Sequence, residues 1–145
     1  MRTVDAGDGR FPGGRPVVFV VDDDVATLAL LSEVALDAGW DARGFTRLTE
    51  LRRAIAAGAP SLLILDDELP DGRGGDLARE MREDPRLAGV PLLVCTAAHP
   101  MRQAEIGGWA PVVSKPFDLG TIERFLDAVD PRTRARRDSR DDRAG

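Results

Sequence analysis

The sequence predicts an α/β fold, a doubly wound, five-stranded parallel sheet with helices on both faces. Two observations support this prediction. Short apolar runs recur along the chain without alternating polar residues, which is typical of strands buried on both faces of a parallel sheet. Between these runs lie segments with apolar residues at helical spacing, long enough for right-handed crossovers between parallel strands. Strand and helix alternate five times in this way, and we expect the strand order 2-1-3-4-5.

The first two strand–helix units occupy residues 17–60. The run from Val17 to Val21 predicts a buried strand, and three consecutive aspartates follow it. The next segment predicts a helix that stops at Gly39, because glycine suits the position after a helix C-terminus. The expected buried face of this helix comprises Val25, Leu28, Leu31, Ala35 and Ala38. Asp41 to Phe45 predicts a short strand, and the apolar spacing after it predicts a second helix that ends near Gly58.

The third unit begins with a second strongly apolar run that ends in acid. Leu62 to Leu65 predicts this strand, and the Pro- and Gly-containing segment 69–74 predicts a turn before a third helix. The run from Val90 to Cys95 predicts the fourth strand. The stretch from Ala97 to Gly108 has room only for a short fourth helix. Val112-Val113 predicts the fifth strand, and a last helix with its apolar residues on one side completes the domain.

The composition excludes several classes of protein. The chain has 145 residues, which suits one domain, and its net charge of −5 argues against bulk affinity for nucleic acid. No apolar run is long enough to span a bilayer, and the first residues lack an apolar signal core, so we expect a cytoplasmic protein without a membrane partner. The single cysteine, Cys95, rules out an internal disulfide and a multi-cysteine metal site, and its apolar surroundings indicate an inert core thiol.

The expected domain spans residues 16–130. Residues 1–15 are rich in Gly, Pro, Arg and Asp and have little to bury, so we expect a disordered leader. Residues 131–145 form an expected disordered tail of Arg and Asp, which lacks the aromatic residues of a nucleic-acid-binding arm. Nothing in the sequence resembles a helix-turn-helix or a catalytic segment, so we expect a stand-alone domain that acts through protein–protein contacts.

Polar side chains follow the predicted strands at the edge where a ligand is expected. Asp22 and Asp23 follow the first strand, Asp66 the third, Thr96 the fourth and Lys115 the fifth. In sheets of this kind, ligands bind beyond the carboxyl ends of the strands, at the point where the strand order reverses. The predicted order places the first and third strands side by side at that point. We therefore expect these side chains to lie close together.

The chemistry of these residues predicts a cation and a phosphoryl group. Converging carboxylates repel each other unless protons or a cation compensate them, and oxygen ligands without His or Cys suit Mg²⁺. A carboxylate such as Asp66 can attack phosphorus to give an acyl phosphate. Lys115, the only lysine in the chain, and the Thr96 hydroxyl would then hold phosphoryl oxygens. Ordinary interpretations also exist: a surface lysine, a strand-end hydroxyl, and aspartates such as Asp24 and Asp118 that cap helices.

Four segments resemble the receiver domains of bacterial two-component response regulators. They are Val20 to Asp24, Leu65 to Pro70 with Gly74 downstream, Cys95 to Ala97, and Lys115 to Phe117. Each segment is a weak signal by itself, but their order and spacing together are specific. The resemblance covers about residues 16–130 and implies a flavodoxin-like fold.

The resemblance also implies a role for each matching residue. Asp66 would be the phosphoacceptor. The ligands of Mg²⁺ would be Asp22 (partly through water), Asp23, Asp66 and the backbone carbonyl of Glu68. Thr96 and Lys115 would contact the phosphoryl group and transmit its arrival, and the Lys115–Pro116 bond would be cis. The donor would be a histidine kinase or a histidine phosphotransfer protein, the target an unidentified downstream protein, and the domain would not be a turnover enzyme.

Three features depart from the family pattern. Three residues before Lys115, where the family usually has Tyr or Phe, this chain has Val112, so the usual switching aromatic is missing. The stretch between Thr96 and Lys115 is short, which predicts a shortened helix 4. Asp67 and Glu68 add charge beside the acceptor. Two interpretations of this charge are open. The side chain of Glu68 approaches the metal or the attacking water, or the side chains of Asp67 and Glu68 both point to solvent.

Two other functions remain open at this point. A haloacid-dehalogenase-like phosphatase also uses strand-end aspartates, Mg²⁺, Thr and Lys. It would require Asp-x-Asp and a Gly-Thr turn after the first strand, whereas Val25-Ala26-Thr27 follows the aspartates here. A receiver-like interaction module that binds partners without switching would fit Val112 and the short fourth helix.

Overall fold

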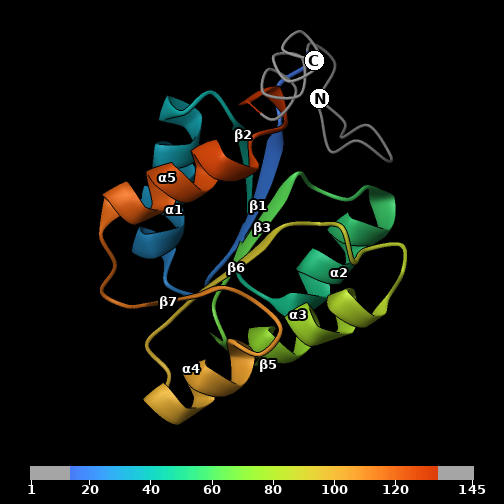
Figure 1. The fold of residues 1–145 in the computed structure, drawn as a ribbon, viewed down its shortest axis with the longest axis vertical. Helices are drawn as coiled ribbons and strands as arrows, with labels where there is room; N and C mark the ends of the chain where they lie inside the picture. The colour runs from blue at the N-terminus through green and yellow to red at the C-terminus, as the bar shows by residue number, and fades with distance from the viewer. Residues whose placement is uncertain (1–13, 134–145) are drawn as a thin grey trace, which may run out of the picture.

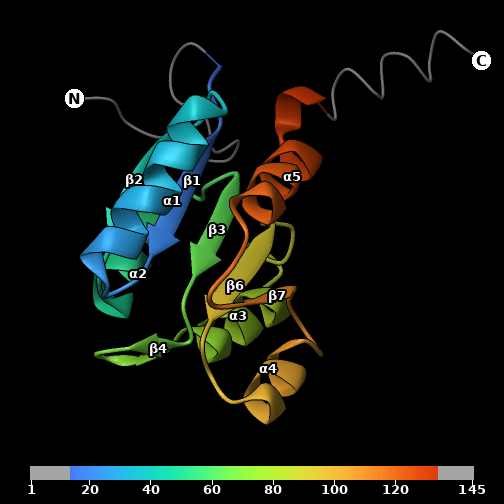
Figure 2. The ribbon, with the colours of Figure 1, turned by 90° about the vertical axis from the view of Figure 1, so that its left-hand side faces the viewer.

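The computed structural model describes residues 14–133, and one parallel sheet forms its centre (Figures 1 and 2). The strands of this sheet are β1 Val17–Val21, β2 Asp41–Phe45, β3 Leu62–Leu65, β6 Leu92–Thr96 and β7 Val112–Ser114. They lie in the order β2-β1-β3-β6-β7, and each neighbouring pair is parallel. The predicted doubly wound, flavodoxin-like fold with strand order 2-1-3-4-5 is therefore confirmed.

Helices cover both faces of this sheet. They are α1 Val25–Asp37, α2 Leu48–Ala57, α3 Gly74–Glu83, α4 Pro100–Ile106 and α5 Leu119–Val129. α1 and α5 lie on one face, and α2 and α3 lie on the other, with α4 beside α3 near the carboxyl ends of the strands (Figure 1). The predicted shortening of the fourth helix is confirmed, since α4 has only 7 residues.

Burial on both faces explains the unbroken apolar runs. Every residue of β1 is 1% exposed or less. Val17, Phe19 and Val21 belong to the core beneath α2 and α3, whereas Val18 and Val20 belong to the core beneath α1 and α5. Because successive side chains of a strand point to opposite sides, a strand covered on both sides needs apolar residues at every position.

The register of the strands brings their carboxyl ends to one level. Val21 at the end of β1 is paired with Leu65 at the end of β3. Leu65 is also paired with Val94 of β6. The ladder continues one step further, because the backbone N–H of Asp66 donates to the carbonyl of Val21 at 3.0 Å. The residues that follow β1 and β3 therefore start beside each other.

Helix ends follow the predicted chemistry at three places. Asp24 accepts a hydrogen bond from the backbone N–H of Ala26 at the start of α1. Asp118 accepts one from the N–H of Gly120 at the start of α5. After α1, Gly39 has a φ of 86°, a left-handed conformation that glycine adopts without steric cost.

The sheet-facing side of α1 differs from the prediction at both ends. Val25 and Ala38 were expected on the buried face, but Val25 is 69% exposed, and Ala38 is exposed and lies at the C-cap, after the last residue of α1. The buried residues of α1 are Leu31, Val34 and Ala35. The first turn of the helix starts beyond the end of β1, where no strand lies beneath it, so the apolar contact begins only further along α1.

Of two predictions near loops, one is extended and the other changes. The expected turn over 69–74 is present at residues 70–71, and it joins the two short strands of an antiparallel hairpin, β4 Glu68–Leu69 and β5 Gly72–Arg73. The fourth strand of the main sheet begins at Leu92 rather than at Val90. The intervening proline has no N–H to donate to a neighbouring strand, which accounts for the later start.

The expected leader, residues 1–15, and the expected tail, residues 131–145, lie almost entirely outside the described residues. Within residues 14–133, no helix combines the length and the apolar character that crossing a bilayer requires.

Candidate functional site

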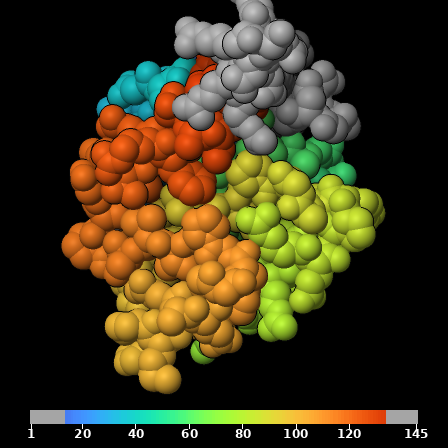
Figure 3. All heavy atoms as spheres, viewed as in Figure 1, coloured from blue at the N-terminus to red at the C-terminus, as the bar shows by residue number. Residues whose placement is uncertain are grey.

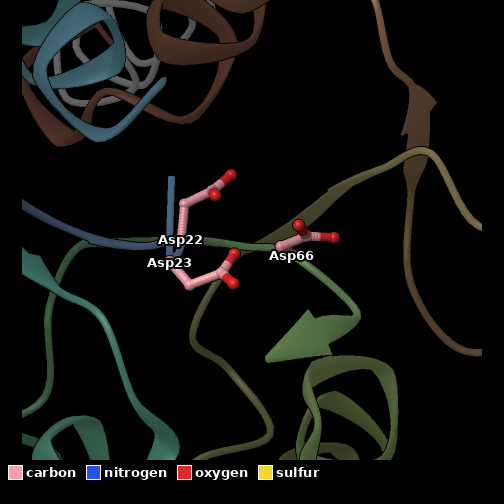
Figure 4. A group of neighbouring side chains, drawn as sticks. All are labelled: Asp22, Asp23 and Asp66. Atoms are coloured by element: carbon pink, nitrogen blue, oxygen red, sulfur yellow. The ribbon is translucent and has the colours of Figure 1, made fainter. Parts of the chain in front are cut away.

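The acidic side chains that the sequence placed at one edge of the sheet lie together in the structure. Asp22 and Asp23 follow β1, Asp66 follows β3, and one carboxylate oxygen of each lies within 4.8 Å of the others. Figure 4 shows the three side chains projecting from the adjacent ends of these strands. Asp22 and Asp66 are 2% and 7% exposed, whereas Asp23 is exposed. Two members of the cluster, Asp22 and Asp66, are therefore buried, and the third, Asp23, is open to solvent.

Backbone hydrogen bonds fix the aspartates that follow β1. The N–H of Asp22 donates to the carbonyl of Phe45 in β2 at 3.1 Å. Asp22 Oδ1 accepts from the N–H of Asp24 at 2.9 Å. Asp24 itself turns away to cap α1, where the hydroxyl of Thr27 also donates to it at 2.8 Å. The consecutive aspartates thus have separate roles, one in the cluster and one at the helix end.

Lys115 brings a positive charge to the cluster. Its Nζ donates to Asp22 Oδ2 at 2.6 Å and to Asp66 Oδ2 at 3.0 Å. Burial by itself would lower the pKa of Lys115, but the hydrogen bonds to Asp22 and Asp66 outweigh this effect and raise it. The lysine is therefore an ammonium at neutral pH. One ammonium beside three carboxylates leaves an excess of negative charge, which a divalent cation would balance. The Lys115–Pro116 peptide bond is cis, as predicted.

The strand ends also place Thr96 next to Lys115. The backbone N–H of Lys115 donates to the carbonyl of Thr96 at 2.9 Å. Thr96 is fully buried, and its Oγ1 accepts a hydrogen bond from the N–H of Ala98 at 3.1 Å. On the acceptor side of the cluster, Asp66 Oδ1 receives the N–H of Glu68 at 3.2 Å. Both carboxylate oxygens of Asp66 thus have a donor, the other being Lys115.

This arrangement matches a known family. The family described as "Response regulator receiver domain" matches residues 18–127, which is most of the chain. The chain belongs to this family. The acidic pocket at the ends of β1 and β3 is accordingly the pocket of a receiver domain of two-component systems.

Relatives and solved structures agree with this assignment. The receiver is 35% identical to the transcriptional regulatory protein GltR of Pseudomonas aeruginosa over 103 residues, 69% of this chain and 43% of that protein. It is 34% identical to the probable transcriptional regulatory protein TcrX of Mycobacterium tuberculosis, over 86% of this chain and 54% of that protein. The chain therefore spans about half the length of these curated relatives.

Among solved structures, the receiver resembles a putative response regulator from Chloroflexus aurantiacus. The TM-score is 0.73 at 24% identity, and the match covers 79% of this chain and 97% of the other. At this identity the likeness supports the fold alone. It agrees with the strand order that the pairings of the main sheet establish.

The donor set of the pocket fits Mg²⁺. The clustered donors are carboxylate oxygens, which hard cations prefer, and no sulfur or imidazole ligand joins them within residues 14–133. Cys95 does not compete, because burial raises the pKa of its thiol to about 12, and the thiol remains protonated. The backbone carbonyl of Glu68 as a further ligand stays a prediction, although Glu68 does lie in the segment directly after Asp66.

Asp67, the residue after the acceptor, lies in a different environment from the one expected. One expectation was that the side chains of Asp67 and Glu68 both point to solvent. Glu68 is exposed, but Asp67 is only 2% exposed. Its carboxylate is bound by Arg102 from α4 and by the N–H of Gly75. A signal was present, because successive side chains of an extended segment point in opposite directions. An acid beside Asp66 had to face away from the pocket, toward α3 and α4.

Proposed function

We propose that this receiver domain accepts a phosphoryl group on Asp66, with Mg²⁺ bound by the pocket. The observation that carries the proposal is Lys115, whose single ammonium bridges Asp22 and Asp66. An ammonium fixed between two carboxylates can neutralise phosphoryl oxygens as they arrive. The phosphoryl donor is a histidine kinase or a histidine phosphotransfer protein.

The proposed transfer is a displacement at phosphorus. A carboxylate oxygen of Asp66 forms a bond to phosphorus while the P–N bond of the donor phosphohistidine breaks. The imidazole nitrogen takes the electron pair, and the ring leaves as neutral imidazole because its other nitrogen already carries a proton in the phosphohistidine. The product is an acyl phosphate on Asp66. Lys115 exchanges its hydrogen bond to the acceptor carboxylate for one to a phosphoryl oxygen.

Other pocket residues support the charged group in this proposal. Mg²⁺ supplies charge neutralisation for the transferring group when it is bound. The ligands are Asp22 (partly through water), Asp23, Asp66 and the backbone carbonyl of Glu68. The oxygen of the Thr96 hydroxyl already accepts from Ala98, so its proton is available for donation to a phosphoryl oxygen.

The proposed output is a protein–protein contact in the cytoplasm with a downstream protein target. The net charge of −5 supports a protein partner over nucleic acid. GltR and TcrX are transcriptional regulators by name, and about half of each lies outside the match with this chain. The domain accepts a group once per cycle and is not a turnover enzyme. The match to the receiver family argues against the alternative function of a haloacid-dehalogenase-like phosphatase.

The test is phosphorylation with a small donor. The protein is incubated with acetyl phosphate and Mg²⁺, and intact mass is measured over time. We expect one phosphoryl adduct in the wild type, none in Asp66→Ala, and none when EDTA removes the metal. Asp71→Asn, an exposed aspartate outside the pocket, is the matched control and should retain the adduct. An adduct of undiminished amount in Asp66→Ala would refute the proposal.

A second candidate, a receiver that binds partners without switching, is favoured by one observation. Val112 lies in β7, three residues before Lys115. It has no aromatic ring or hydroxyl whose movement could be coupled to a movement of Thr96. A beryllofluoride titration distinguishes the two candidates. NMR shifts confined to the pocket favour the non-switching module, and shifts that extend to β7 and α5 favour a switch.

A further inference from the structure

Arg102 of α4 is the centre of an ion-pair cluster on the far side of the acceptor loop, residues 66–75. Its Nε donates to Asp67 Oδ2 at 3.0 Å and its Nη2 donates to Asp67 Oδ1 at 2.9 Å. Nη2 also donates to Asp76 Oδ1 at 2.8 Å, and Nη1 donates to Glu105 Oε1 at 3.2 Å. The two bonds to Asp67 form a bidentate pair, the geometry for which the planar guanidinium is suited and an ammonium is not.

Burial separates Asp67 from the other partners of Arg102. The side chains of Arg102 and Asp67 are 12% and 3% exposed, whereas those of Asp76 and Glu105 are 61% and 60% exposed. Exposed ion pairs contribute little to structure, but removing one partner of a buried pair leaves an uncompensated charge. Arg102 is therefore bound to the acceptor loop through Asp67, and its other partners, Asp76 and Glu105, lie at the solvent-exposed rim of the cluster.

Asp67 passes this constraint to the backbone on both sides of the loop. Asp67 Oδ1 also accepts from the N–H of Gly75 at 3.0 Å, and its carbonyl accepts from the N–H of Gly74 at 2.9 Å. Through these hydrogen bonds Asp67 holds the first turn of α3 against the start of the loop.

α4 packs directly on this part of the backbone. A Cβ on Gly75 would lie 2.7 Å from Cδ1 of Ile106 and 2.8 Å from Oδ1 of Asp67, so glycine is required for the approach. The indole N–H of Trp109, just after α4, donates to the carbonyl of Gly75 at 2.8 Å. In the space-filling view, the gold segment around α4 and the yellow-green segment of α3 are neighbours on one surface (Figure 3).

A neighbour of Arg102 on the same helix holds the other side of the pocket. Nε2 of Gln103 donates to the carbonyl of Ala98 at 2.8 Å, to Ser114 Oγ at 3.2 Å and to the carbonyl of Thr96 at 3.4 Å. α4 therefore contacts both the segment after β3 and the ends of β6 and β7. Val112 has no polar side-chain group, so it provides no comparable link.

We propose that Arg102 is a positioning residue, which acts through Asp67 to fix the acceptor loop and to couple α4 to the pocket. The loop that Asp67 anchors carries Asp66 on one side and Glu68 on the other, and a shift of either displaces Asp67. Coupling is reciprocal, so an occupied pocket changes α4 and the position of α4 changes the affinity of the pocket. This inference rests on the proposed function for its ligand, but the anchoring itself requires no ligand.

The first test uses hydrogen exchange without any ligand. Arg102→Met keeps an apolar stem and removes the guanidinium, and Glu105→Gln, on the same helix, removes only a rim partner. We expect the amide of Gly75 to exchange roughly tenfold faster in Arg102→Met and to change by less than about twofold in Glu105→Gln. Arg102→Lys should lie between them, because lysine keeps the charge without the bidentate geometry. Equal exchange in Arg102→Met and Glu105→Gln would overturn the anchoring.

The second test uses beryllofluoride and Mg²⁺ with NMR detection of backbone amides. In the wild type we expect shifts at pocket residues such as Asp23 and Lys115 and also at residues of α4. In Arg102→Met the pocket shifts should persist with roughly fivefold weaker affinity, while the shifts of α4 should fall to about a third or less of wild type. Unchanged shifts of α4 in Arg102→Met overturn the coupling.

The two proposals fail in different ways. Absence of beryllofluoride binding in the wild type contradicts the proposed function, and the exchange of Gly75 then still decides whether Arg102 anchors the loop. A circular dichroism melt of each variant shows whether it is folded. If Arg102→Met is unfolded, the comparison of Arg102→Lys with Glu105→Gln decides the same question.

Discussion

Two consecutive aspartates lead to two different clusters of charge on opposite sides of one loop. Asp66 faces the pocket, where the ammonium of Lys115 pairs with two of the three clustered carboxylates, Asp22 and Asp66. Asp67 faces α4, where the guanidinium of Arg102 binds it with two hydrogen bonds. The first cluster is open, because its two buried carboxylates, Asp22 and Asp66, outnumber its one ammonium. The second is closed, because its one buried carboxylate, Asp67, is matched by one guanidinium, while the other two partners of Arg102 are exposed to solvent. A cation is therefore expected at the first cluster, whereas the second holds the loop in place without one.

The presence of a lysine in the open cluster and an arginine in the closed cluster fits this difference between the two clusters. Lysine is a compact charge on a flexible stem, which can leave one oxygen for another when a phosphoryl group arrives. Arginine is a planar fork that binds one carboxylate along two bonds, which suits a fixed support. The only lysine of the chain lies in the cluster that we propose to change during function, and an arginine lies in the cluster that does not.

The largest effect is expected where a glycine lies against the acceptor itself. A Cβ on Gly74 would overlap the backbone carbonyl of Asp66, so Gly74→Ala must displace the acceptor loop. We expect loss of the acetyl phosphate adduct in the intact-mass assay and a destabilisation of about 3 kcal/mol or more, measured by urea unfolding. Gly89→Ala is the control, because its Cβ would meet nothing within 4 Å. Wild-type phosphorylation in Gly74→Ala would show that the loop can move freely.

The next effect is at the closed cluster. Arg102→Met leaves the buried carboxylate of Asp67 without its main partner, and we expect the free energy of unfolding to fall by about 3 kcal/mol. Because Asp67 does not belong to the candidate metal cluster of Asp22, Asp23 and Asp66, addition of Mg²⁺ should not restore the loss. The measurement is urea unfolding with and without Mg²⁺. Recovery by Mg²⁺ would mean that the two clusters share charge across the loop.

A smaller, metal-dependent effect is expected at the open cluster. Lys115→Met removes the ammonium between Asp22 and Asp66, so the free energy of unfolding should fall by about 2 kcal/mol in EDTA. Mg²⁺ should offset this loss and stabilise the variant more than it stabilises the wild type, since the carboxylates then lack any other cation. Equal stabilisation of both proteins by Mg²⁺ would argue against competition between Lys115 and the metal, and no stabilisation of either protein would argue against a metal at these carboxylates.

The smallest effect concerns a carboxylate outside both clusters. Asp71 accepts hydrogen bonds from the hydroxyl and the backbone N–H of Thr49 and from the N–H of Leu48, which together lower its pKa to about 2. A carboxyl with a lowered pKa in the folded state stabilises the fold above its unfolded pKa of about 3.8, and this contribution disappears as the pH falls toward 2.

Asp71→Asn should therefore flatten the pH dependence of unfolding between about pH 4 and pH 2, with little change in the slope above pH 5. The measurement is a series of thermal melts across this range. Asp118→Asn is the control, because Asp118 caps a different helix. The same slope in Asp71→Asn and the wild type would assign the acid sensitivity to other carboxylates.

The sheet and the pocket follow from patterns that are visible in the sequence. Unbroken apolar runs indicated parallel strands, and parallel strands deliver the residues after them to one edge. For that reason Asp22, Asp66 and Lys115, far apart in the chain, were correctly expected to meet. The shortened α4 also followed from the sequence, since the stretch between Thr96 and Lys115 leaves little room for a helix.

The partners of the loop aspartates Asp67 and Asp71 depend on how the helices pack and are not predictable from sequence patterns. Asp67 meets Arg102 from 35 positions away, and Asp71 caps α2 from the tip of a small hairpin. Alternation along the segment after β3 indicates only that Asp67 faces away from the pocket, and no periodicity or topology rule names the partner of Asp67 or of Asp71. Both pairings depend on how α2 and α4 pack on the sheet, because an ion pair or a cap forms only when packing brings donor and acceptor within hydrogen-bond distance.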